Sequence, residues 1–295
     1  MSEGIAWVMD AASNFALHLS VLLAIVYLFF RLAGRKGLAW ACLACACLGL
    51  GALLPSFERS VPVAPCAAPA ERLRVVSFNL LFKNRRFEDV RRGLEALKPN
   101  VIVVEEANGT WPEQLTPLRE RYPYRRGDAG WGAVLLFSDR PFVDSEEKFP
   151  GFPQRQQVSA TVRVGAARVR IVGAHFIRPN SPELFARRGA ELDALATAVQ
   201  GSRVPTIVAG DFNASPLSLE LHRFLAASGL VRPRPQGPLA TWPSALPELG
   251  LQIDHILVTP ELAVERLEAG PDLGSNHLPI VADIAAPVSG SCRAP

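Results

Sequence analysis

Apolar residues form two long runs near the N-terminus of the chain. No charged residue occurs in residues 11–30 or in residues 37–57. At a rise of about 1.5 Å per residue, each run is long enough, or nearly so, to cross a bilayer as a helix. Glu3 and Asp10 precede the first run and no basic segment does, which argues against a cleaved signal peptide. The pattern predicts two transmembrane helices, at about residues 11–30 and 38–55.

After these runs, the hydrophobic pattern changes to short strands and amphipathic helices. The expected parts of the chain are a membrane anchor at residues 1–57, a Pro- and Ala-rich linker at 58–71, a folded domain at 72–286 and a tail at 287–295. Short apolar runs predict strands at residues 73–78, 101–104, 133–137, 158–164, 169–174, 206–209, 252–258 and 280–285. Helical spacing and capping residues predict helices at residues 85–97, 181–199 and 216–228, the last with Ser215 as its N-cap and Pro216 at its first position. Because strands outnumber helices, this arrangement favours a layered α/β sandwich.

Polar side chains stand in or beside the ends of these predicted strands. They are Asn79, Glu106, His175, Asp211, Asn213, Asp254 and His277. Asp211 and Asn213 alone could form a simple Asx-turn that leaves a strand. Taken together, the carboxylate and amide oxygens suit Mg²⁺ or Mn²⁺, and the histidines suit proton transfer. The set predicts metal-dependent hydrolysis of a phosphoester.

Composition and cysteine positions narrow the class of protein. The formal net charge of +3 is close to neutral, so no basic field indicates nucleic acid. No P-loop, no G-x-S-x-G elbow and no zinc-type cluster occurs after the anchor. Cys42, Cys45 and Cys47 lie in the second apolar run, where helix packing is favoured over metal binding. Cys66 and Cys292 flank the folded domain, and a disulfide between them is allowed if the domain lies outside the cytoplasm.

Short stretches of this sequence resemble the endonuclease/exonuclease/phosphatase superfamily of metal-dependent phosphohydrolases. The stretches are SFNL at 77–80, PNVIVVEEA at 99–107, GAHF at 173–176, GDFNASP at 210–216, IDHILV at 253–258 and SNHLPI at 275–280. They occur in the family's order, which makes the set far more specific than any single stretch. The resemblance covers about residues 72–286. It implies a four-layered α/β sandwich of the DNase I-like type, preceded here by the two predicted transmembrane helices.

The resemblance also implies a metal site. Asn79 and Glu106 would hold Mg²⁺ or Mn²⁺, and Glu105 stands where the family usually has Gln. The family usually has Asp before its last His, whereas this chain has Asn276. An amide can still coordinate through its carbonyl oxygen, so Asn276 stays in the predicted ligand set. The loss of one carboxylate predicts weaker metal binding or a single-metal site.

The remaining site residues receive catalytic roles from the same resemblance. His175 would contact the phosphate, and Asp211 would orient or deprotonate a water that attacks in line with the leaving group. Asn213 would bind a phosphate oxygen. Asp254 would hydrogen-bond His277 and fix its tautomer, so that His277 can stabilise or protonate the phosphoryl group.

The predicted anchor bears on location and substrate. Arg31, Arg35 and Lys36 lie between the two apolar runs, and positive residues stay on the cytoplasmic side. This predicts a multi-pass protein of the cytoplasmic membrane with an extracytoplasmic catalytic domain, similar to bacterial membrane-anchored members of the family. Some of those members are associated with envelope lipid phosphates and glycopeptide resistance. We expect a phosphoesterase acting on a lipid-linked phosphomonoester, diphosphate or phosphodiester; an anchored DNA endonuclease or exonuclease and an inactive binding module are the alternatives. The sequence leaves the oligomeric state open.

Overall fold

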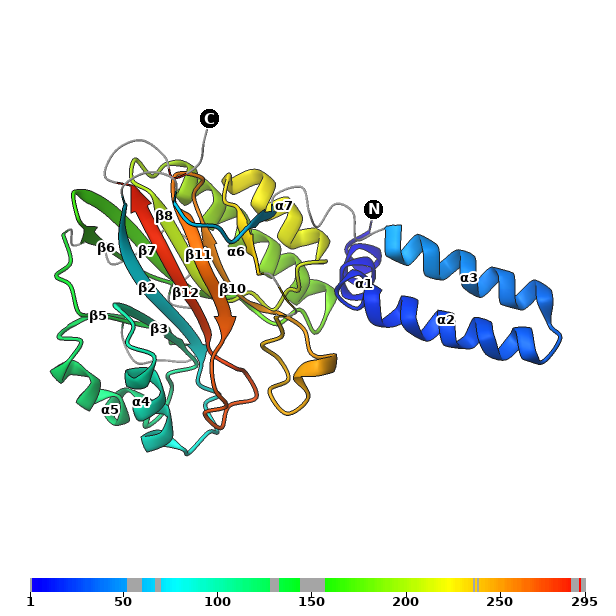
Figure 1. Ribbon diagram of the computed structural model, residues 1–295, viewed down its shortest axis with the longest axis horizontal. Coiled ribbons are helices and arrows are strands. Elements are labelled where there is room, and N and C mark those ends of the chain that lie inside the picture. The colour runs from blue at the N-terminus through cyan, green and yellow to red at the C-terminus, as the bar shows by residue number, and fades with distance from the viewer. Residues whose placement is uncertain are drawn as a thin grey trace.

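Two β-sheets packed face to face, with helices on their outer faces, form the body of the protein (Figure 1). The computed structural model describes residues 2–51, 60–66, 70–127, 133–143, 157–235, 237, 239–287 and 292. The end of the second predicted membrane helix, parts of the expected linker and most of the expected tail lie outside the described residues. A pair of helices projects from one end of the sandwich (Figure 1).

The larger sheet carries the first site residues. Its strands lie in the order β11 (Ala263–Ala269), β12 (Ile280–Pro287), β2 (Ala70–Asn79), β3 (Val101–Glu105), β5 (Leu135–Ser138) and β4 (Tyr124–Arg126). Strands β2 and β3 are parallel and are joined by helix α4 (Phe87–Ala96). Their register pairs Asn79 with Glu105. Asn79 and the two glutamates therefore meet at one edge of this sheet, at the strand ends where the sequence predicts them.

The smaller sheet carries most of the catalytic candidates. Its strands lie in the order β10 (Asp254–Val258), β8 (Thr206–Asp211), β7 (Ala167–His175) and β6 (Val158–Val164). Asp211 at the end of β8 is paired with His175 on one side and with Asp254 on the other. The ladder therefore sets these three side chains at one level of the sheet. Helices α6 (Pro182–Gln200) and α7 (Leu219–Ser228) cover its outer face (Figure 1).

Alternation of apolar side chains explains the four layers. In β2, Val75 belongs to the core between the sheets and Val76 to the core under α4. In β8, Ile207 lies between the sheets and Val208 lies under α6 and α7. Successive side chains of a strand point to opposite faces, so a strand that is apolar on both faces must be covered on both. The four-layered α/β sandwich is confirmed.

Some short elements and boundaries differ from the sequence-based prediction. The unpredicted elements include β1 (Ser60–Pro62), β9 (Arg232–Arg234), α5 (Trp111–Gln114), β4, β11 and two 3₁₀ helices, η2 (Thr116–Glu120) and η3 (Pro247–Leu249). Strand β11 is an edge strand with polar positions, so its hydrophobic signal is weak. Helix α7 begins at Leu219, because Ser218 accepts a hydrogen bond from the Leu221 amide and acts as the N-cap. The prediction of Ser215 as the cap was wrong.

Residues 2–51, the described part of the N-terminal stretch, form three helices. They are α1 (Glu3–Asn14), α2 (Ala16–Leu32) and α3 (Lys36–Gly51), and α2 and α3 form the projecting hairpin in Figure 1. Among the described helices, none alone is both long and apolar enough to cross a bilayer, whereas α1 and α2 pass that test as a pair bent by 73°. The first expected span is therefore divided at Phe15. Membrane anchoring stays a prediction.

Helix α1 packs on the sandwich, against α6 and α7. Asp10 is buried, and its carboxylate accepts hydrogen bonds from Arg188 Nη2 at 2.7 Å and from Ser218 Oγ at 2.7 Å. Asn14 Oδ1 accepts one from the Ser215 amide at 2.6 Å. Trp7 Nε1 donates to the Pro179 carbonyl at 2.8 Å. These contacts tie α1 to the folded domain, although its sequence position suggested the anchor.

A disulfide joins Cys66 to Cys292. The two cysteines are 226 residues apart in sequence and their Cα atoms are 4.7 Å apart, so the bond closes a long loop around the domain. Constraining so long a loop in the unfolded chain stabilises the folded state, by about 2–4 kcal/mol in typical proteins. The disulfide between Cys66 and Cys292, which the sequence allowed, is thus present in the structure.

Reducing this disulfide is expected to lower the free energy of unfolding by about 2–4 kcal/mol. Urea denaturation with and without reductant measures the difference. The matched control is a Cys66→Ser, Cys292→Ser double variant, whose unfolding midpoint should not respond to reductant. Equal midpoints for the oxidised and reduced wild type would contradict the expectation.

Candidate active site

Strand ends from both sheets converge on one cavity of about 420 Å³. The predicted site residues that line it are Glu106, His175, Asp211, Asn213, Asn276 and His277. Asn79 and Asp254 are buried behind them and reach the site through Asp211 and His277. The structure therefore brings together every residue that the sequence placed in the site.

Asp211 is at the centre of the polar contacts. Its Oδ2 accepts a hydrogen bond from Asn79 Nδ2 at 3.1 Å, and its Oδ1 accepts one from the Asn213 amide at 2.8 Å. His175 Nε2 and His277 Nε2 lie 3.6 Å and 3.9 Å from Asp211 Oδ2. Asp211 is thus held by donors on both sides, with imidazoles close enough to share a phosphoryl group or a water with it.

Burial dominates the electrostatics of Asp211. It raises the pKa of this carboxyl, and repulsion from Asp254 raises it further, while His277 and His175 lower it. A carboxylate whose basicity is raised in this way accepts a proton from water more readily than an exposed one does. These properties suit Asp211 to the role of general base.

Asp254 and His277 form a buried pair. His277 Nδ1 donates to Asp254 Oδ2 at 2.9 Å, which directs Nε2 toward Asp211. Burial opposes a charge on His277, but the attraction of Asp254 and this hydrogen bond outweigh it and raise the pKa of His277 to about 9. At neutral pH the imidazole is therefore protonated. It can donate to a phosphoryl oxygen from Nε2 while Asp254 fixes its orientation.

The backbone at the end of β8 explains how Asp211 and Asn213 are presented. Gly210 has a φ of 151°, and a Cβ there would lie 1.7 Å from the Ala174 carbonyl oxygen. Only glycine permits this approach of β7 and β8. Asn213 has a φ of 48°, which turns its Nδ2 toward the Phe176 carbonyl at 3.1 Å and toward Asp211. The Asx-turn weighed from the sequence is present and forms part of the site.

The two glutamates after β3 have different environments. Glu106 has a φ of 54°, and its Oε2 accepts a hydrogen bond from the Phe82 amide at 3.0 Å. Glu105 is fully buried and accepts one from Ser77 Oγ at 2.7 Å. Burial raises the pKa of Glu105 well above its usual value, against the effect of Ser77. A neutral acid at Glu105 can occupy the place where the family usually has an uncharged Gln.

The donor set fits a hard divalent cation. Asn79 Nδ2 lies 3.1 Å from Asp211 Oδ2 and 3.4 Å from Glu106 Oε1, so two carboxylates approach one amide group. A cation beside these two acids would stabilise their charged forms. Oxygen donors of this kind suit Mg²⁺ and Mn²⁺. Asn79 and Glu106 remain the ligands we would assign.

A second combination of possible ligands is less suitable. Single oxygen or nitrogen atoms of Asp211, Asp254 and His277 lie within 4.8 Å of one another. However, both Asp254 oxygens face His277 Nδ1, at 3.2 Å and 2.9 Å. Asp254 is therefore already engaged in orienting the imidazole. Asn276 lies at the cavity wall with an exposed side chain, where it can approach a cation from the solvent side.

Some lining residues were not found from the sequence. They are Ala11, Asn14 and Phe15 near the N-terminus, and Leu81, Phe82, Arg178, Pro179, Asn180, Trp242, Leu251 and Ile253. The sequence signal for the first group is weak, because Asp10 and Asn14 do not stand out from other polar residues at the start of the first apolar run, such as Ser13 and His18. Arg178 is the only lysine or arginine among the described lining residues, and its guanidinium carbon lies 5.7 Å from the Trp242 ring centroid.

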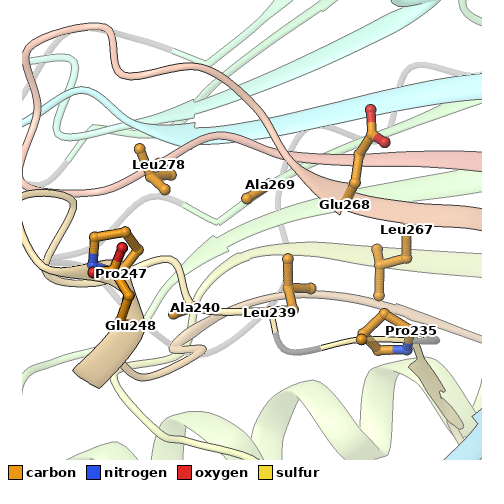
Figure 2. A pocket seen from close by; sticks show the side chains of 10 residues that line it. Pro235, Leu239, Ala240, Pro247, Glu248, Leu267, Glu268, Ala269 and Leu278 are labelled. Carbon is orange, nitrogen blue, oxygen red and sulfur yellow. The ribbon is translucent and has the colours of Figure 1, made fainter.

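A second hollow has a different character. Figure 2 shows that it lies beside β11, lined by Pro235, Leu239, Ala240, Pro247, Glu248, Leu267, Glu268, Ala269 and Leu278. Its charged side chains, Glu248 and Glu268, are both acidic, and the others that Figure 2 labels are apolar. No histidine, amide or basic side chain is among the described residues that line it, in contrast to the cavity at Asp211.

The two-sheet sandwich and the acid, amide and histidine groups at its strand ends define a class of phosphoester hydrolases. The chain belongs to the Endonuclease/Exonuclease/phosphatase family, whose model matches residues 76–277. Among curated protein sequences, none matches the chain.

Solved structures with the same fold act on different substrates. D. rerio TDP2, complexed with single strand DNA product, has a TM-score of 0.60 and 17% identity, covering 72% of this chain and 98% of its own. The 3' phosphatase NExo from Neisseria, bound to a product DNA hairpin, has a TM-score of 0.58 and 19% identity, covering 71% and 98%. Sphingomyelinase C from Streptomyces griseocarneus has a TM-score of 0.54 and 18% identity, covering 73% and 99%. At these identities the likeness shows the fold alone, so the substrate must be argued from this chain.

Proposed function

We propose that this protein is a Mg²⁺- or Mn²⁺-dependent phosphoesterase, anchored in the cytoplasmic membrane with its catalytic domain outside, and that it hydrolyses a lipid-linked phosphate. The observation that carries the catalytic part is the arrangement around Asp211. One buried carboxylate is held by two amides and faced by two imidazoles, one of which is paired with Asp254. This set can activate a water and stabilise phosphoryl charge within one cavity.

The chain's own residues divide the chemistry between them. Asp211 accepts the proton of the attacking water, and its hydrogen bonds to Asn79 and Asn213 hold it in place. Protonated His277 donates to a phosphoryl oxygen, and His175 contacts the phosphate from the other side of Asp211. A cation held by Asn79 and Glu106, with Asn276 beside it, would supply positive charge that neutralises phosphoryl oxygens. Donors placed before the reaction stabilise the charge of the transition state without reorganisation.

The helical hairpin supports membrane anchoring. Large apolar side chains are exposed along α2 and α3, among them Leu22, Ile25, Leu28, Phe29, Leu38, Trp40 and Leu48. A surface this apolar is typical of contact with a membrane or with a protein partner. Arg31, Arg35 and Lys36 lie at the tip of the hairpin, which the positive-inside rule assigns to the cytoplasmic side. The Cys66–Cys292 disulfide suits an oxidising, extracytoplasmic compartment.

A DNA nuclease is the second candidate, favoured by the DNA-bound structures that share the fold. It requires a basic surface to neutralise the phosphate backbone. The net charge is only +3, and Arg178 is the only lysine or arginine among the described residues at the cavity. An inactive binding module gains support from Asn276 alone, while the complete Asp211–His277–Asp254 set argues against it.

The test uses the full-length protein in mixed detergent micelles with Mg²⁺. Phosphate release from a polyprenyl diphosphate and from phosphatidic acid is measured beside nicking of plasmid DNA. Lipid turnover that EDTA abolishes, without nicking, supports the proposal. Nicking that EDTA and Asp211→Ala both abolish, without lipid turnover, would establish the nuclease instead. No turnover of lipid or DNA would favour the binding module.

Replacing Asn276 with Asp is expected to tighten Mg²⁺ binding by about 10-fold or more, because it adds a negative charge beside the proposed ligands. The Mg²⁺ concentration that gives half-maximal activity measures the change. Asn180→Asp is the matched control, since Asn180 also lines the cavity but is not a proposed ligand. An equal effect of both variants would mean that only the general charge of the cavity matters.

A further inference from the structure

The catalytic cavity has two halves of different chemistry. Glu106, His175, Asp211, Asn213 and His277 form the polar half, and Phe15, Phe82, Trp242, Leu251 and Ile253 supply large apolar side chains. A free phosphate or a small polar ester would leave the apolar half in contact with water. A ligand that fills about 420 Å³ of this composition has an apolar group next to its phosphate.

Phe15 lines the cavity and joins helix α1 to helix α2. It stands at the break between α1 and α2, with φ of −107° and ψ of 15°, where the helix axes bend by 73°. Phe15 is 44% exposed, so it is not part of the hydrophobic core. A large aromatic group exposed at the edge of a cavity is available for contact with a ligand.

The position of Phe15 is fixed by its neighbours on both sides. Before it, Asn14 is hydrogen-bonded to the amide and the hydroxyl of Ser215, in the stretch that follows Asn213. After it, His18 Nε2 lies 3.0 Å from the Leu249 carbonyl oxygen. The rim of the cavity is therefore held to the sandwich at two points, although it belongs to the N-terminal helices.

The apolar hairpin starts at the same point. Helix α2 begins at Ala16, directly after Phe15, and runs away from the sandwich (Figure 1). Leu22, Ile25 and Phe29 are each more than half exposed along it. An amphiphile whose apolar part lies in a membrane around this hairpin would place its head group near the N-terminal end of α2. That end of the helix adjoins Phe15 at the rim of the catalytic cavity.

We propose that Phe15 and the α1–α2 junction form a substrate-recognition wall, which binds the apolar group next to the phosphate of an amphiphilic substrate. This inference rests on the proposed lipid phosphoesterase function and adds the residue that selects for the amphiphile. Phe15 acts on binding, while the polar half carries out the reaction. A soluble phosphoester with no apolar group binds the polar half of the cavity and makes no contact with Phe15.

The test compares matched substrates that differ in their apolar part. Farnesyl diphosphate is paired with methyl diphosphate, and dioctanoyl phosphatidic acid with glycerol 3-phosphate. Full-length wild type, Phe15→Ala and Phe15→Leu are assayed in mixed micelles. Leu17→Ala is the matched control, because Leu17 is 49% exposed, close to the 44% of Phe15, but does not line the cavity. Thermal unfolding checks that every variant keeps its fold.

We expect Phe15→Ala to raise KM about 10-fold for the amphiphile that wild type uses, since burying a large apolar side chain against a ligand contributes on this scale. Its kcat/KM for the soluble partner should stay within about 2-fold, Phe15→Leu should recover most of the loss, and Leu17→Ala should match wild type. Equal losses on both substrates of a pair, or no loss on either, would overturn the inference while the proposed function stands. A wild type that turns over neither amphiphile would overturn both.

Discussion

Asp211→Asn is expected to lower kcat/KM for the phosphoester substrate by about 1,000-fold or more while the fold is retained. The amide keeps the size of the side chain, but it cannot accept a proton from water, and it removes the negative charge that His175 and His277 face. Loss of a general base and of the charge arrangement around it accounts for an effect on this scale. Initial rates in mixed micelles measure the change, and circular dichroism checks the fold.

Asp193→Asn is the matched control for this prediction. Its side chain is 61% exposed on α6, and its nearest ion-pair partner, Arg223, is 3.4 Å away and also exposed. The same chemical change there should leave kcat/KM within about 2-fold, as for most surface substitutions. An Asp211→Asn variant that keeps a tenth or more of the wild-type activity would remove Asp211 from the role of base.

Arg188→Ala is expected to reduce the free energy of unfolding by about 3–5 kcal/mol. Arg188 is fully buried, and its guanidinium donates to Asp10 at 2.7 Å, to Glu220 at 2.7 Å and to the Asn213 carbonyl at 2.6 Å. Removing it leaves the buried Asp10 carboxylate without its cation, and leaves buried Glu220 only the exposed Arg223 at 3.9 Å. The variant should also lose activity, because Asn213 in the catalytic loop loses a donor that fixes its backbone.

Urea denaturation of Arg188→Ala and of Arg223→Ala provides the comparison. Arg223 also contacts Glu220, at 3.9 Å, but its side chain is 58% exposed. An exposed pair of this kind contributes about 0–1 kcal/mol. Similar unfolding midpoints for the two variants would show that the buried network of Arg188 does not stabilise the fold.

Much of the site was predictable because the candidate catalytic and metal-binding residues stand at the ends of strands. The apolar run that ends at Asp211 gives a clear strand signal, and parallel β2 and β3 bring Asn79 beside the glutamates. The excess of strands over helices also indicated a layered α/β sandwich. These are local patterns, and a single sequence carries them directly.

The contacts of α1 were not predictable in the same way. Asp10 and Asn14 lie about 200 residues from Ser215 and Ser218, and nothing in the local pattern joins them. Arg188 looks like one of many charged residues on a helix, yet it is fully buried because its partners come from three segments. At Ser215 the hydroxyl accepts a hydrogen bond from the Leu217 amide in a single turn, and the helix begins only after Ser218, so the Ser-Pro signal marked a turn three residues too early.

The docking of α1 restricts how the proposed anchor can enter a bilayer. Helix α1 precedes the hairpin in the chain and the sandwich follows it, yet the Asp10–Arg188 ion pair joins the two. Both flanks of the proposed membrane hairpin must therefore lie on the same side of the bilayer, which that proposal can meet with two crossings or a re-entrant loop but not with a single crossing. During synthesis the cavity rim is made first and its catalytic groups last. The wall that α1 contributes to the cavity is therefore complete only after the domain that holds α1 has been synthesised.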